Sequence, residues 1–79
     1  MENEIRYYLK SIKQAMANEE KAFKPSYLVT ACRLPTGAIE LAVNTSNISE
    51  KIDYILEAYD EEMCLKNNSE IRIENILIV

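Results

Sequence analysis

The chain contains no histidine and no tryptophan, and it has only one glycine and two cysteines among its 79 residues. Without histidine, the usual general base for a serine or cysteine nucleophile is missing. A single glycine excludes the glycine-rich loops that bind phosphate groups. No acidic stretch has the Asp-x-Asp-x-Asp-Gly pattern of a calcium loop. These absences point away from an enzyme, and we expect neither a metal nor another cofactor.

The chain also lacks an apolar run of about 18 residues, which a membrane-spanning helix needs, and no signal peptide is recognisable at its start. We therefore expect a cytoplasmic protein whose two cysteines, Cys32 and Cys64, are reduced. Both are interpreted as small apolar side chains, Cys32 in a strand and Cys64 beyond a helix.

What the chain does contain is typical of a folded globular protein, since 48% of its residues are apolar and 28% are charged. At this length, residues 1–79 are expected to form one domain with one small core. Association with a second copy is a common way for such a core to gain stability. The net charge of −4 argues against nucleic acid as a partner, because phosphate binding needs clustered lysine and arginine.

The first part of the chain predicts a helix over residues 2–23. Its apolar residues recur at steps of four, three and four, which places them on one side of a helix: Ile5, Leu9, Ile12 and Met16. The charged run 19–21 continues the helix, and Phe23 is its expected last core residue. Pro25 ends it, because a proline forces the preceding residue out of the helical conformation.

Residues 26–43 predict a β-hairpin. Leu34-Pro35-Thr36-Gly37 fits a type I turn followed by a residue with positive φ, and the only glycine of the chain occupies that last position. In the second strand, the apolar residues Ile39, Leu41 and Val43 alternate with smaller or polar ones. We expect the face that carries them to be buried.

A second helix is predicted from Asn47, its expected cap, to about Met63. Its core stripe runs at steps of four, three, four and four through Ile48, Ile52, Ile55, Tyr59 and Met63. Residues 66–69 predict a turn, and residues 70–79 predict a final strand. The alternation in that strand slips at Asn75, which a β-bulge would explain, as would a strand buried on both faces at its C-terminal end.

The predicted order is therefore α-β-β-α-β, an α+β fold. The second helix returns the chain across the sheet. We therefore expect a three-stranded antiparallel or mixed sheet of order 2-1-3, with both helices on one face. Three strands leave two edges and one uncovered sheet face, and the apolar end of the last strand has no charged residue to prevent pairing with another chain. Pairing of edges, or packing of two uncovered faces, would bury this end. We expect a homodimer in which this segment forms the interface: Ile76, Leu77, Ile78 and Val79.

The negative charge is concentrated in residues 50–62, which contain six acids and one base. On the predicted helix, Asp53, Glu57 and either Asp60 or Glu61 share one face, and Tyr54 lies beside them. Such a run of acids disfavours the helix, through mutual repulsion and at its C-terminal end. Three interpretations stay open: a solvated helix face, a docking surface for a basic protein, and a divalent metal site.

Residues 27–44, from Tyr27-Leu-Val-Thr-Ala-Cys to Ile-Glu-Leu-Ala-Val-Asn44, resemble the small acidic accessory proteins that phages and prophages of Gram-positive bacteria encode. Residues 50–54 (Glu-Lys-Ile-Asp-Tyr) and 57–60 (Glu-Ala-Tyr-Asp) share this resemblance, which covers about half of the chain. It implies a non-enzymatic, often dimeric protein that binds and inhibits a host or defence protein. The element order also resembles part of a KH domain, but the Gly-x-x-Gly clamp and basic groove of that family are absent.

We therefore expect a protein-interaction module that binds a basic host protein through the second helix, with these residues in contact: Asp53, Tyr54, Glu57, Asp60 and Glu61. The alternative is a protein that sequesters a small molecule or nucleotide in a pocket at a dimer interface. In that case the ligand would raise the melting temperature, because it binds only the folded chain.

Overall fold

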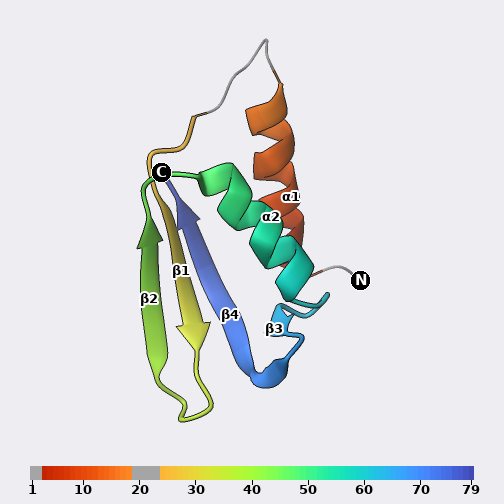
Figure 1. Ribbon diagram of the computed structural model, residues 1–79, viewed down its shortest axis with the longest axis vertical. Helices are drawn as coiled ribbons and strands as arrows, with labels where there is room; N and C mark the ends of the chain where they lie inside the picture. Colours follow the sequence, from red (N-terminus) through yellow and green to blue (C-terminus); the bar gives the residue numbers. More distant parts are fainter. Residues whose placement is uncertain (1–2, 19–23) are drawn as a thin grey trace.

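The computed structural model describes residues 3–18 and 24–79, and Figure 1 shows two helices beside one sheet. The elements follow in the order α1 (Glu4–Ala17), β1 (Leu28–Arg33), β2 (Ile39–Asn44), α2 (Ile48–Ala58), β3 (Cys64–Leu65) and β4 (Asn68–Ile78). The predicted α+β class is confirmed. The predicted continuation of the first helix through residues 19–21 to Phe23 lies outside the described residues.

The sheet has four antiparallel strands in the order β2-β1-β4-β3, so the prediction of three strands is wrong. The three predicted strands do occur in the predicted order, as β2-β1-β4. The additional strand, β3, is only two residues long and pairs with the beginning of β4. A strand this short has no alternating pattern to detect, because the period of a strand is itself two residues.

The hairpin between β1 and β2 has the predicted turn. The Leu34 amide donates to the Ala38 carbonyl at 2.9 Å, and the Gly37 amide donates to the Leu34 carbonyl at 2.8 Å. Gly37 has a φ of +90°, a conformation that side chains with a Cβ adopt rarely. The single glycine therefore sets the register in which β1 and β2 pair, with Val29 opposite Val43.

β4 runs antiparallel to β1, and its register shifts where Ala31 and Cys32 face Asn75 and Ile73. One residue of β4, Glu74, is left without an opposite partner at this point. Of the two explanations for the slip at Asn75, the bulge is confirmed. The bulge explains why the inward-facing apolar residues have odd numbers before Asn75, at Ile71 and Ile73, and even numbers after it, at Ile76 and Ile78.

The core lies between the helices and one face of the sheet. Among the described residues, seven apolar side chains are buried in one cluster, with Met16, Ile5 and Ile12 packed at its margin: Leu9, Leu28, Ile48, Ile52, Ile55, Met63 and Ile73. The predicted core stripe of the first helix and the isoleucines of the second are thus confirmed. In β1, the residues that face this core are Leu28, Thr30 and Cys32.

The opposite face of the sheet is exposed, and it carries Ile39, Leu41 and Val43 at exposed fractions of 49%, 68% and 60%. The prediction that this face is buried is wrong. Both faces of the hairpin have apolar residues, and the described helices cover only the face that carries Leu28 and Thr30. Alternation alone could not decide which of the two faces they would cover.

Helix α2 begins where predicted and ends five residues early, at Ala58 rather than Met63. Asn47 occupies the cap position with a φ of 54°, but its side chain makes no capping hydrogen bond. Met63 lies in the following turn with a φ of 66°, and its side chain is fully buried. The methionine thus reaches the core from a turn. Its spacing in the sequence also fits one more turn of the helix, so the helical periodicity could not show that the helix had already ended.

Candidate interaction surfaces

The first candidate surface is the exposed side of α2. It carries Glu50, Asp53, Tyr54 and Glu57, all of them exposed. They are spaced three or four residues apart, so they share the side opposite the buried isoleucines of the helix. Three of the predicted partner-binding residues, Asp53, Tyr54 and Glu57, therefore do lie together.

Part of the negative charge on this surface is balanced from within the chain. The Lys13 ammonium of α1 forms an ion pair with the Asp53 carboxylate, and both side chains are about half exposed. An exposed pair of this kind contributes about 0–1 kcal/mol to stability. Among the described residues no ion pair is found for Glu57, so its carboxylate is the freer one for an external cation.

Tyr54 is the aromatic group of this surface, with 52% of its side chain exposed. The Lys51 ammonium lies 5.0 Å from the centroid of its ring, within the range of a cation–π contact. Exposed tyrosines are enriched at protein interfaces, because the ring buries much area with little loss of rotamer freedom. The surface therefore combines carboxylates with a ring face, both of which attract cations.

The last two predicted partner-binding residues are not on the helix, because α2 ends at Ala58. The Asp60 carboxylate folds into the turn and accepts hydrogen bonds from the amides of Glu62 at 2.8 Å and Cys64 at 3.0 Å. Asp60 therefore shapes the turn, and the prediction that it continues the acidic face of the helix is wrong. Glu61 is exposed on the same turn.

The second candidate surface is the exposed face of the sheet, which we call the open sheet face. Nine uncharged positions on three neighbouring strands make up this face: Tyr27, Val29 and Ala31; Val43, Leu41 and Ile39; and Val79, Leu77 and Asn75. Arg33, which pairs with Ile39, continues the same side of β1 at the hairpin end. Eight of the nine residues are apolar or aromatic. The sequence predicts an uncovered sheet face, but it places Ile39, Leu41 and Val43 on the buried one, because the first strand has apolar residues on both faces.

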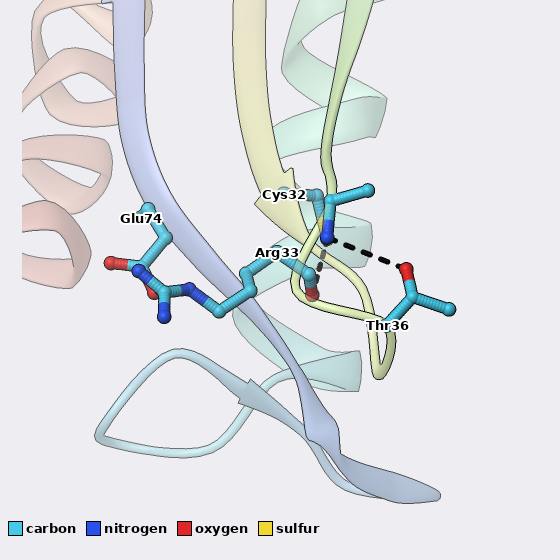
Figure 2. Close-up of polar contacts among 5 residues, drawn as sticks. Cys32, Arg33, Thr36 and Glu74 are labelled. Carbon is cyan, nitrogen blue, oxygen red and sulfur yellow. Dashed lines mark hydrogen bonds and ion pairs between the residues drawn. The ribbon is translucent and has the colours of Figure 1, made fainter.

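At the hairpin end, this face is bounded by charge. The Arg33 side chain extends from β1 toward Glu74 of β4, and its Nε lies 2.8 Å from the Glu74 carboxylate (Figure 2). Beyond this ion pair the exposed residue Arg72 stands opposite Arg33 in the register. The charged residues thus mark the rim of the face.

The predicted dimer segment divides between the two faces of the sheet. Ile76 and Ile78 are partly buried and pack against the core, whereas Leu77 and Val79 are exposed at 57% and 59% on the open sheet face. β4 also pairs with β1 along this segment, from Leu28–Ile78 to Thr30–Ile76. Half of the four side chains therefore belong to the core of the chain itself.

The fold changes the titration of the phenol of Tyr59. Burial raises its pKa from 10.0 to about 12, with further contributions from the neighbouring Cys32 and from the charges of Tyr54 and Glu40. Cys32 is a free thiol, half-buried on the core face of β1. With its pKa raised, the Tyr59 hydroxyl stays protonated at neutral pH and is no candidate for a base.

Over residues 3–18 and 24–79, no group of three carboxylate, thiol or imidazole side chains lies close enough together to bind a metal ion. Both cysteines are free. Neither α1 nor α2 has the length and apolar character to cross a membrane.

Comparison with known proteins identifies no relative of this chain. No family model, no curated protein and no solved structure matches this chain.

Proposed function

We propose that this chain is a non-enzymatic protein-interaction module that binds a basic protein surface through the exposed side of α2. The contact residues are Asp53, Tyr54 and Glu57, with Glu61 on the turn that follows the helix. The observation that supports this proposal is the position of Tyr54, half exposed on the same side of α2 as Asp53 and Glu57.

Two internal contacts suggest how such a partner would bind. The ammonium groups of Lys13 and Lys51 already lie on this surface, one paired with Asp53 and the other over the ring of Tyr54. Lysine or arginine side chains of a partner would make the same two kinds of contact. Because exposed ion pairs contribute little to stability, exchanging an internal lysine for a partner's cation costs little.

The resemblance to phage accessory proteins suggests the class of partner, a protein of the host or of its defence systems. A basic surface on such a protein commonly binds nucleic acid through its lysines and arginines. A module that covers that surface with carboxylates would compete with the nucleic acid, and its association would weaken as salt screens the charges.

The experiment is an affinity capture from bacterial lysate with four forms of the chain, followed by mass spectrometry. Glu57→Lys reverses one charge in the centre of the surface. Glu70→Lys makes the same change in charge at an exposed position of β4, away from α2. The expected result is a basic protein that the wild type and Glu70→Lys retain, and that Glu57→Lys and Tyr54→Ala lose.

An identical set of captured proteins for all four forms would rule out the α2 surface as the binding site. Loss with Glu57→Lys and Glu70→Lys alike would indicate a dependence on net charge instead of on this surface. Circular dichroism of each variant checks that the fold is retained, which is expected because all three residues are exposed.

A further inference from the structure

We propose that the open sheet face binds the open sheet face of a second copy of this chain, in a reversible, two-fold symmetric dimer. This contact lies on the opposite side of the sheet from α2. It is therefore independent of the proposed binding of a basic partner, and either proposal can fail without the other.

The distribution of charge favours a second copy as the occupant. The nine positions of the face carry no charged residue, and Arg33, which lies beside Ile39 at the hairpin end, is paired with Glu74. The acids of residues 50–62 lie on α2 and the turn after it, in the layer beyond the sheet. Two chains of net charge −4 can therefore meet at this face with their acidic sides pointing apart. A basic partner would gain no attraction from this face.

The shape of the face favours a symmetric contact. A shallow hollow of about 160 Å³ lies at its centre, where Ala31 and Asn75 are flanked by the larger Val29, Leu41 and Leu77. In a two-fold contact, the same patch serves both partners, so the projecting leucines of one copy can fill the hollow of the other. Two sheet faces packed in this way stand about 10 Å apart, with their strands about 30° from parallel.

The area of the face indicates how strong the dimer would be. Six of its side chains are about half exposed or more: Tyr27, Ile39, Leu41, Val43, Leu77 and Val79. Together they expose on the order of 400 Å² of apolar surface, taking roughly 100 Å² for a whole aliphatic side chain and about 200 Å² for tyrosine. A standard interface buries about 800 Å² on each partner, so this patch with its charged rim makes a contact at the small end. We therefore expect reversible association.

The small core supplies a reason for such an association. Seven buried apolar residues make up the core of the described part of the chain. A domain of this size gains comparatively little from burying its own surface, and a second copy adds burial without lengthening the chain.

The test is analytical ultracentrifugation of the wild-type chain from about 1 µM to about 500 µM, a range that brackets the affinity of a small interface. Leu41→Lys places a charge at the most exposed apolar position of the face, where 68% of the side chain is exposed. Tyr7→Lys is the matched control, because Tyr7 is 65% exposed and lies on α1. Val43→Lys is a second variant of the face, in case Leu41→Lys fails to fold by circular dichroism.

The expected result is a wild-type chain that changes from monomer to dimer over this range. Tyr7→Lys and Glu57→Lys should dimerise with the wild-type dissociation constant, whereas Leu41→Lys and Val43→Lys should raise it by about tenfold or more. A wild-type chain that stays monomeric at the highest concentration would overturn the proposal and leave the face for a different protein. Folded Leu41→Lys and Val43→Lys chains that dimerise as the wild type does would also overturn it.

Discussion

The guanidinium group of Arg6 donates a hydrogen bond of 2.9 Å to the carbonyl oxygen of Leu56, which ties α1 to the C-terminal end of α2. The same group donates to the carbonyls of Tyr59 at 3.0 Å and Asp60 at 3.3 Å. The last carbonyls of a helix have no partner within it, and the partial negative charge there attracts a cation. Arg6 thus supplies hydrogen-bond donors to the carbonyl groups at the end of α2, although it lies 50 residues before Leu56 in the chain.

Replacing this arginine should destabilise the fold. Arg6→Met keeps much of the apolar stem and removes all three hydrogen bonds, so we expect the free energy of unfolding to fall by about 2 kcal/mol. Urea denaturation followed by circular dichroism measures this change. Gln14→Met, at an exposed position of the same helix, is the control and should stay within about 0.5 kcal/mol of the wild type. Equal stability of the two variants would show that the arginine does not hold the helix end.

Asp60 offers a second test, because the structure assigns it to the turn and not to the binding surface. Asp60→Ala removes the acceptor for the amides of Glu62 and Cys64, and should lower the free energy of unfolding by about 1–2 kcal/mol. Asp60→Asn keeps a carbonyl oxygen at that place and should cost less. Glu61→Ala, next to it and exposed, should have almost no effect on stability. The reverse order of the two alanine variants would contradict the role of Asp60 in the turn.

The raised pKa of Tyr59 makes a prediction about alkaline pH. The group has a pKa of about 12 in the folded chain and 10.0 ordinarily, so above pH 10 the unfolded chain loses this proton first. The contribution of the Tyr59 hydroxyl to the free energy of unfolding is therefore fully present below pH 10 and falls as the pH rises toward 12. Urea midpoints measured across that interval should fall more steeply for the wild type than for Tyr59→Phe.

Absorbance of the tyrosinate form provides an independent measurement of the same group. The step of the folded chain that occurs at the highest pH should disappear in Tyr59→Phe. If that step persists in the variant, the high pKa belongs to a different tyrosine.

The candidate surfaces could be predicted from the sequence only in part. Asp53, Tyr54 and Glu57 are grouped because helical spacing alone puts residues three or four apart on one side. Asp60 and Glu61 could not be placed, because the end of α2 depends on Arg6 and on the Asp60 turn. Neither of those contacts leaves a periodic signal in the sequence. An uncovered sheet face was predicted, but its residues were assigned to the buried face, since apolar residues occur on both sides of the first strand.

Local patterns by themselves determined the elements of this protein. The apolar spacing of Ile5 and Leu9 specified a helix, the single glycine at position 37 specified the hairpin turn, and the slip at Asn75 marked the place of the bulge. These features depend on neighbours a few residues away. Tertiary structure alone decided that Leu28 faces the core while Leu41 faces outward, and that a two-residue strand, β3, joins the sheet. A strand with two apolar faces has no internal preference between them, so the choice falls to the helices that pack against the sheet.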